Sequence, residues 1–223
     1  TGAATAGAAV DAGNPVQAGD ATPTPDPDSA SLADRARRAV FEGDLEQGIA
    51  LWQQVVAEAS DEQRLEAVLE LGRAYLLAGE YDMAIAQASW AAAVDATPEL
   101  RMRALGLLGT AQEAAGDWRG AAESLTQLVS MDERAAPYVW WHIAGAYKSI
   151  GDLPRQIAAL ESIDVSRLEP AFRAEVLSEL ASAYRANEDP NSALQVYDQI
   201  LGFATLPDYR ALISHNKGET LRE

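Results

Sequence analysis

The feature of this sequence that most constrains its fold is an internal repeat. From about residue 31 onward, a turn with Gly or an acidic residue is followed four residues later by a usually small residue and then by an apolar helix. These equivalent positions are 48, 84, 121, 156 and 193, and their spacings are 36, 37, 35 and 37 residues. A period of about 34 residues is typical of helix–turn–helix units that bury their apolar faces only by stacking on one another.

Each unit contains two segments with the apolar periodicity of an amphipathic helix. The first helices of the units are predicted at about 31–42, 61–78, 98–115, 137–150 and 170–187. The second helices are predicted at about 45–58, 81–94, 118–131, 154–163 and 190–203, and a further helix begins near 207.

Residues that favour helix ends lie at these boundaries. Thr97 and Asp189 each precede a proline, a combination that caps a helix and starts its first turn. Ser60 with Gln63, and Ser166 with Glu169, have the spacing of a capping box. Three glycines are expected where the chain leaves a first helix: Gly79, Gly116 and Gly151.

Several residues in register resemble the tetratricopeptide repeat family, whose pattern places a Leu-Gly pair and a Tyr on the first helix and Ala on the second. The second unit matches it best, and the others match in part, through Leu71-Gly72, Tyr75, Ala84, Ala91, Leu108-Gly109, Ala121, Trp140, Tyr147, Leu180-Ala181, Tyr184 and Ala193. The resemblance implies an all-α fold, a right-handed superhelical solenoid of antiparallel helix hairpins. The units of this repeat domain, residues 30–223, are expected at about 31–60, 61–97, 98–136, 137–169 and 170–206, with a terminal helix at 207–223.

The strongly acidic composition limits the kinds of partner. The net charge is −17 and the isoelectric point about 4.4, so the chain repels nucleic-acid phosphates and anionic membranes. No apolar run approaches the roughly 18 residues of a membrane span. The absence of cysteine excludes disulfides, thiolate zinc sites and cysteine nucleophiles.

Residues 1–29 differ from the repeats. They are rich in Ala, Gly, Thr, Pro and Asp and contain no aromatic or basic residue, so we expect a disordered linker. Such a linker often separates a domain from a membrane anchor. The composition therefore favours an exported bacterial protein, periplasmic or extracellular. A cytoplasmic location remains an open alternative. The first residues, Thr1 and Gly2, are expected to follow a processing or engineering step, and the pattern after 207 favours truncation over a capping helix.

Catalytic and metal-binding patterns are missing from the sequence. The two histidines, His142 and His215, fall in different units, and no carboxylate–histidine cluster has metal-ligand spacing. Gly-rich phosphate loops and Ser-centred nucleophile elbows are also absent. We therefore predict a protein that is not an enzyme and has no cofactor.

In the tetratricopeptide family the first helices line a concave groove that binds peptides. Transferring the family's groove positions to this sequence gives a row of cations and two aromatic anchors: Arg37, Arg73, Arg103, Tyr138, Trp141, Lys148 and Arg185. Arg binds carboxylates in a bidentate manner, so these residues suggest an acidic peptide or protein segment as the partner. The alternative is that the arginines pair with glutamates of neighbouring units and Trp141 packs between repeats.

The leading functional hypothesis is an adaptor or scaffold that binds a partner segment in its groove. Two alternatives stay open. The chain could be the non-catalytic helical arm of a larger enzyme, for example one that acts on cell wall. It could also be a self-assembling structural protein, because solenoid ends can stack on one another.

Overall fold

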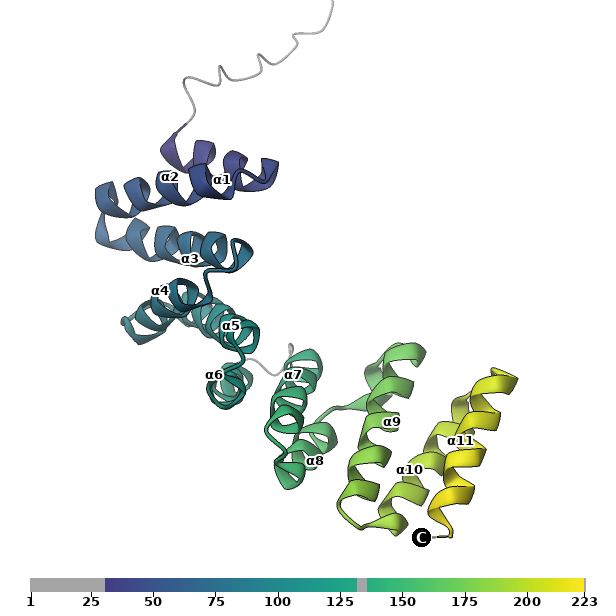
Figure 1. Ribbon diagram of the computed structural model, residues 1–223. Coiled ribbons are helices and arrows are strands. Elements are labelled where there is room, and N and C mark those ends of the chain that lie inside the picture. Colours follow the sequence, from purple (N-terminus) through teal and green to yellow (C-terminus); the bar gives the residue numbers. More distant parts are fainter. Residues whose placement is uncertain (1–30, 132–135, 223) are drawn as a thin grey trace, which may run out of the picture. The chain divides into compact units, whose positions relative to one another are not determined.

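The computed structural model describes residues 31–131 and 136–222. Within them the chain folds into five helical hairpins followed by a single helix, confirming the predicted all-α, right-handed solenoid of antiparallel hairpins (Figure 1). The first helices are α1 (Leu32–Glu42), α3 (Asp61–Leu77), α5 (Pro98–Ala115), α7 (Ala136–Ser149) and α9 (Pro170–Ala186). The second helices are α2 (Leu45–Glu58), α4 (Tyr81–Ala93), α6 (Trp118–Met131), α8 (Leu153–Glu161) and α10 (Pro190–Phe203), and α11 (Pro207–Thr220) ends the series.

The helix boundaries lie within two residues of the predicted spans, because local end signals determine them. The Thr97 hydroxyl accepts a hydrogen bond from the Leu100 amide, and the Asp189 carboxylate accepts one from the Ser192 amide. Gly79, Gly116 and Gly151 have φ values of 78°, 80° and 73°. This left-handed conformation favours glycine and lets the chain turn into the second helix.

The two predicted capping boxes are wrong. Ser60 is the N-cap of α3, but its side chain makes no capping hydrogen bond. Ser166 lies in a short 3-10 helix (Val165–Arg167) that the sequence did not predict, and its backbone amide and hydroxyl both donate to Asp164. The residue that caps α9 is Glu169. The first pattern thus marked the right N-cap residue without its hydrogen bond, whereas the second marked a serine three residues before the N-cap of α9.

Small side chains let neighbouring helices approach closely, both within a hairpin and between consecutive hairpins. A Cβ atom added at Gly109 would lie 2.6 Å from Cδ2 of Leu125, on the partner helix α6. At Gly48 the added atom would lie 2.6 Å from Cγ2 of Val40, and at Gly72 it would lie 2.9 Å from Cδ2 of Leu107. Buried alanines, among them Ala84 and Ala121, have the same effect on the second helices.

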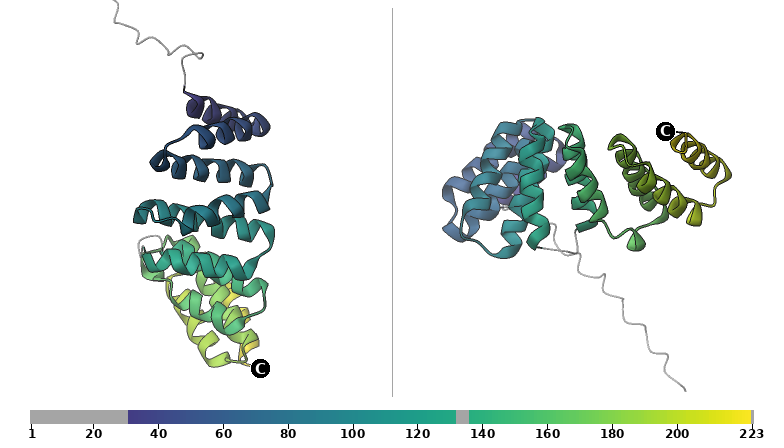
Figure 2. Two further views of the ribbon diagram at one scale, coloured as in Figure 1. Left: turned by 90° about the vertical axis from the view of Figure 1, so that its left-hand side faces the viewer. Right: turned by 90° about the horizontal axis from the view of Figure 1, so that it is seen from below.

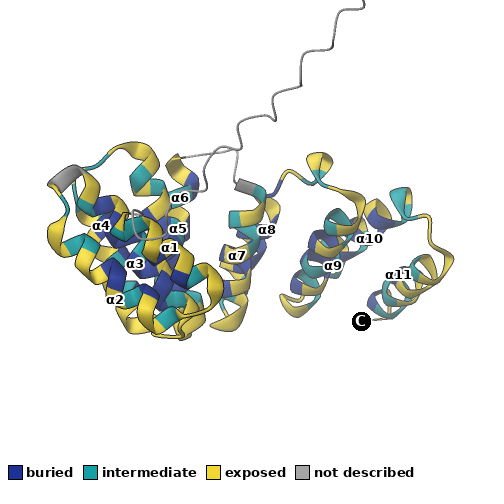
Figure 3. Cartoon of the chain, turned by 90° about the horizontal axis from the view of Figure 1, so that it is seen from above, coloured by how far each residue is buried: buried dark blue, intermediate teal, exposed yellow. Residues whose placement is uncertain are grey.

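The apolar core is a series of clusters along the stack of hairpins. One cluster joins the first two hairpins, a second joins α3, α4 and α5, and a third extends from α6 to α11. Figure 3 shows the buried residues on the sides of the helices that face their neighbours. A hairpin by itself leaves one apolar face in water, so each depends on the next for burial.

Side chains of successive first helices contact one another, and we call the surface that α1, α3, α5, α7, α9 and α11 form the first-helix face. Arg103 of α5 pairs with glutamates of α3, His142 of α7 with Glu113 of α5, and Lys148 of α7 with Glu179 of α9. The hairpins follow one another along the stack in both views of Figure 2.

The linker predicted for residues 1–29 lies outside the described residues. In the part that the structure describes, no helix combines the length and apolar character needed to cross a membrane.

Candidate partner-binding surface

Three basic side chains of the first-helix face each pair with a carboxylate that is more buried than the basic side chain. The Lys148 side chain is 60% exposed, whereas its partner Glu179 is 23% exposed. His142 and Glu113 are 59% and 18% exposed. Arg73 pairs with Glu70, and their exposed fractions are 60% and 26%. The outermost charge is therefore positive at Lys148 and Arg73, and at His142 when its imidazole is protonated, although the whole chain is strongly acidic.

Arg103 bridges two carboxylates of the preceding unit. Its Nη2 atom lies 3.2 Å from Oε1 of Glu70, and its Nη1 atom lies 3.4 Å from Oε1 of Glu66. Glu66 is the exception to the burial pattern, because it is more exposed than Arg103. Glu70 thus accepts from both Arg73 and Arg103 and holds them side by side.

Lys148 and His142 have partners in neighbouring units. The Lys148 ammonium lies 2.6 Å from Oε1 of Glu179. Nδ1 of His142 lies 3.1 Å from Oε2 of Glu113. The hydrogen bond that the imidazole donates to the Glu113 carboxylate raises the pKa of His142 above its ordinary value of 6.5, against a smaller opposing effect of burial.

Tyr138 and Trp141 join a third aromatic residue that the sequence analysis did not select. The Tyr138 ring stacks on Phe172 of α9 with centroids 5.1 Å apart, and Trp141 meets the same ring edge-on at 5.6 Å. Tyr138 is nevertheless 63% exposed. Trp141 therefore packs between repeats, as one alternative required, while the cluster still presents aromatic surface to solvent.

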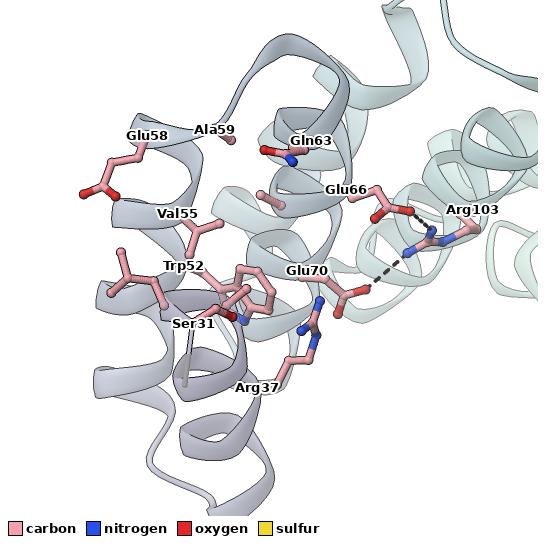
Figure 4. Close-up of a pocket in the computed structure, with 13 residues that line it drawn as sticks. Ser31, Arg37, Trp52, Val55, Glu58, Ala59, Gln63, Glu66, Glu70 and Arg103 are labelled. Carbon is pink, nitrogen blue, oxygen red and sulfur yellow. Dashed lines mark hydrogen bonds and ion pairs between the residues drawn. The ribbon is translucent and has the colours of Figure 1, made fainter. Parts of the chain in front are cut away.

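Arg37 lies beside a cavity of about 650 Å³ between the first hairpins, shown in Figure 4. Its guanidinium lies 5.5 Å from the ring centroid of the buried Trp52 and pairs with Asp34 at 2.9 Å. Arg103, joined to Glu66 and Glu70, lines the same cavity. Arg185, by contrast, is half-buried near the end of α9.

The structure thus divides the predicted site residues into groups. Arg37 and Arg103 share the first cavity, while Tyr138, Trp141 and Lys148 lie along one side of α7. The sequence analysis missed Glu70, Glu113, Glu179 and Phe172, because their importance depends on which residues face them from the next unit. The repeat register could have paired these positions. Among the described residues, no three His, Asp or Glu side chains lie close enough to hold a metal ion.

Comparison with known proteins agrees with the repeat pattern. The tetratricopeptide repeat family model matches residues 104–136 and 176–205. Both segments contain helices that the repeat register had assigned to the third and fifth units. These two segments are tetratricopeptide repeats.

Solved tetratricopeptide-type structures have the same fold. A structure of kinesin-light-chain TPR-like repeats from Podosopora anserina is 26% identical, with a TM-score of 0.59 over 77% of this chain and 92% of that one. A crystal structure of the MamA protein is 20% identical, with a TM-score of 0.64 over 79% and 96% of the two chains. No curated protein matches the sequence.

Proposed function

We propose that this chain is a non-catalytic scaffold that binds an acidic segment of a partner protein along its first-helix face. The observation that carries this proposal is the arrangement of charge, with exposed Arg73, Lys148 and His142 above carboxylates that are more buried. The tetratricopeptide repeats at residues 104–136 and 176–205 support protein binding in general. The acidic character of the partner follows from the outermost cations.

The internal ion pairs do not prevent a ligand from using these cations. An exposed ion pair contributes only about 0–1 kcal/mol, so exchanging part of it for a ligand carboxylate costs little. An Arg guanidinium has five donors and a Lys ammonium has three, so one carboxylate leaves several unused. The glutamates beneath them reduce the freedom of the long side chains, which lowers the entropy lost on binding.

A matched pair of charge reversals tests the proposal. Arg103→Glu/Lys148→Glu removes two cations from the first-helix face. The control, Arg119→Glu/Arg155→Glu, makes the same change in net charge on the second helices α6 and α8. It also breaks an ion pair, because Arg155 pairs with Asp152. Partners would be captured by cross-linking in extracts of the source organism, identified by mass spectrometry, and titrated as purified proteins by calorimetry.

If the first double variant alone fails to bind a purified partner in calorimetry, the proposal is supported. Equal affinity of both variants for every partner would move binding to the second helices or the inter-repeat loops. If calorimetry detects no partner that binds the wild-type chain, the helical-arm or self-assembly alternative becomes the better hypothesis. Circular dichroism melting curves must show both variants as helical as the wild type.

A further inference from the structure

A second, smaller cavity opens on the first-helix face between α7 and α9. Its volume is about 300 Å³, and its lining comprises Trp141, Ala144, Gly145, Lys148, Ser149 and Glu179. This volume lies at the lower end of the roughly 300–1,000 Å³ of sites that bury small molecules. The cavity can therefore take one large side chain, but not a helix or a strand.

The cavity borders Gly145, which has no side chain to fill it. The same repeat position holds Arg37, Arg73, Thr110 and Ser182 in the other units, at spacings of 36, 37, 35 and 37 residues once Gly145 is included. A Cβ atom added at Gly145 would have no neighbour within 4 Å, so helix packing does not require glycine there. Glycine inside a helix costs about 1 kcal/mol relative to alanine. Folding stability alone does not explain a glycine at position 145. Keeping the cavity open to a ligand does explain it.

One wall of the cavity is a preordered aromatic ring. Trp141 meets Phe172 edge-on with the ring planes at 80°, and Phe172 is itself stacked against Tyr138. Because the other rings hold Trp141 in place, little side-chain entropy is lost when an apolar group packs against it. Trp and Tyr in such positions are the residue types that dominate binding energy at interfaces.

The opposite end of the cavity carries one exposed cation. Glu179 accepts hydrogen bonds from the buried Gln156, at 2.8 Å, and from Lys148, at 2.6 Å. Glu179 is thus held from two sides, while the Lys148 ammonium has further donors directed away from it. The Ser149 hydroxyl does not compete, because it donates to the Gly145 carbonyl at 2.9 Å.

We propose that this cavity is an anchor site for one large apolar side chain of the partner, aromatic or aliphatic, next to a carboxylate that accepts a hydrogen bond from Lys148. The inference rests on the proposed function, because it locates one contact within the same face. It narrows the partner class from an acidic segment to one in which an acidic group neighbours a bulky apolar residue.

The absence of cysteine from the chain permits a direct test. The Gly145→Cys variant places a single thiol at the cavity, and Gly202→Cys places one at an exposed glycine of α10 that also has open space around it. Each variant is equilibrated with the disulfide of mercaptoacetyl-phenylalanine or of mercaptoacetyl-glycine. The exchange swaps one thiol for another without net oxidation, and intact-mass spectrometry gives the 2-mercaptoethanol concentration that releases half of the probe.

At Gly145→Cys we expect the phenylalanine probe to resist about tenfold more reductant than the glycine probe, since part of its ring leaves water. At Gly202→Cys the ratio should be close to one. Adding Trp141→Ala to Gly145→Cys should remove most of the preference. At Gly145→Cys the phenylalanine probe, which has a free carboxylate, should also resist more reductant than the same probe with a C-terminal amide. Adding Lys148→Met should abolish this second preference.

Equal release of the two probes at both positions would overturn the anchor site. That result is separable from failure of the proposed function, because the Arg103→Glu/Lys148→Glu variant can still lose its partner when the cavity binds nothing. Gly145→Leu gives a second check without a thiol. It fills the cavity and should weaken binding of a captured partner at least fivefold, whereas Gly202→Leu should leave it unchanged, and equal affinities would contradict the inference.

Discussion

Replacing Gly109 with alanine tests the close packing that places one helix of a hairpin against the other. The new Cβ would lie 2.6 Å from Cδ2 and 2.7 Å from Cγ of Leu125. Carbon atoms in favourable contact are about 3.5–4.0 Å apart, so the overlap is close to 1 Å. Because Cγ is the branch point of the Leu125 side chain, rotating the terminal methyl groups alone does not relieve it.

Two opposing effects determine the magnitude. Overpacking a core costs about 1–3 kcal/mol. Alanine also stabilises a helix by about 1 kcal/mol relative to glycine. Gly106, one turn earlier in the same helix, separates the two effects, because a Cβ there would lie 3.7 Å from Cδ2 of Leu128, an ordinary contact. The two alanine variants should therefore differ by about 1–3 kcal/mol in their free energies of unfolding, with Gly106→Ala the more stable.

Urea unfolding followed by circular dichroism at 222 nm measures this difference. Leu125→Ala provides an internal control, because it removes the atoms that the new methyl group would meet. In that background, Gly109→Ala should become stabilising by about 0.5–1 kcal/mol. If Gly109→Ala and Gly106→Ala raise the unfolding midpoint equally in the otherwise wild-type chain, the inferred helix contact is wrong.

Three further outcomes are expected. The raised pKa of His142 means that its ion pair with Glu113 stabilises the fold fully below about pH 6.5 and is lost as pH rises through the raised value. Unfolding of the wild type should thus show a loss of stability as the pH rises above 6.5 that His142→Gln lacks. Thr97→Ala should cost about 1 kcal/mol in denaturant unfolding, and Ser60→Ala much less, since only Thr97 makes a capping hydrogen bond. Gly116→Ala, at φ 80°, should lower the melting temperature because the left-handed conformation disfavours alanine.

The sequence by itself determined the helices and their order. The repeat period, the prolines after Thr97 and Asp189 and the glycines after the first helices act over a few residues, so they can be read without knowing the fold. The capping box at Ser166 was wrong because a Ser-x-x-Glu pattern also suits a short 3-10 turn, and only the packed chain decides between the two.

The sequence also placed the cations on first helices, because the repeat register assigns each of them to the first helix of a unit. It did not determine which charges meet across repeats. Glu70, Glu113 and Glu179 become partners of Arg103, His142 and Lys148 only when neighbouring hairpins stack. The same holds for Phe172 between Tyr138 and Trp141.

The opening at Gly145 illustrates the difference most directly. In the sequence it is one glycine in a helix, at a position where other units hold larger residues. In the structure it opens a cavity whose walls come from two hairpins. Helix formation depends on residues three or four apart, whereas a binding surface depends on side chains from separate units, and only the tertiary structure brings those together.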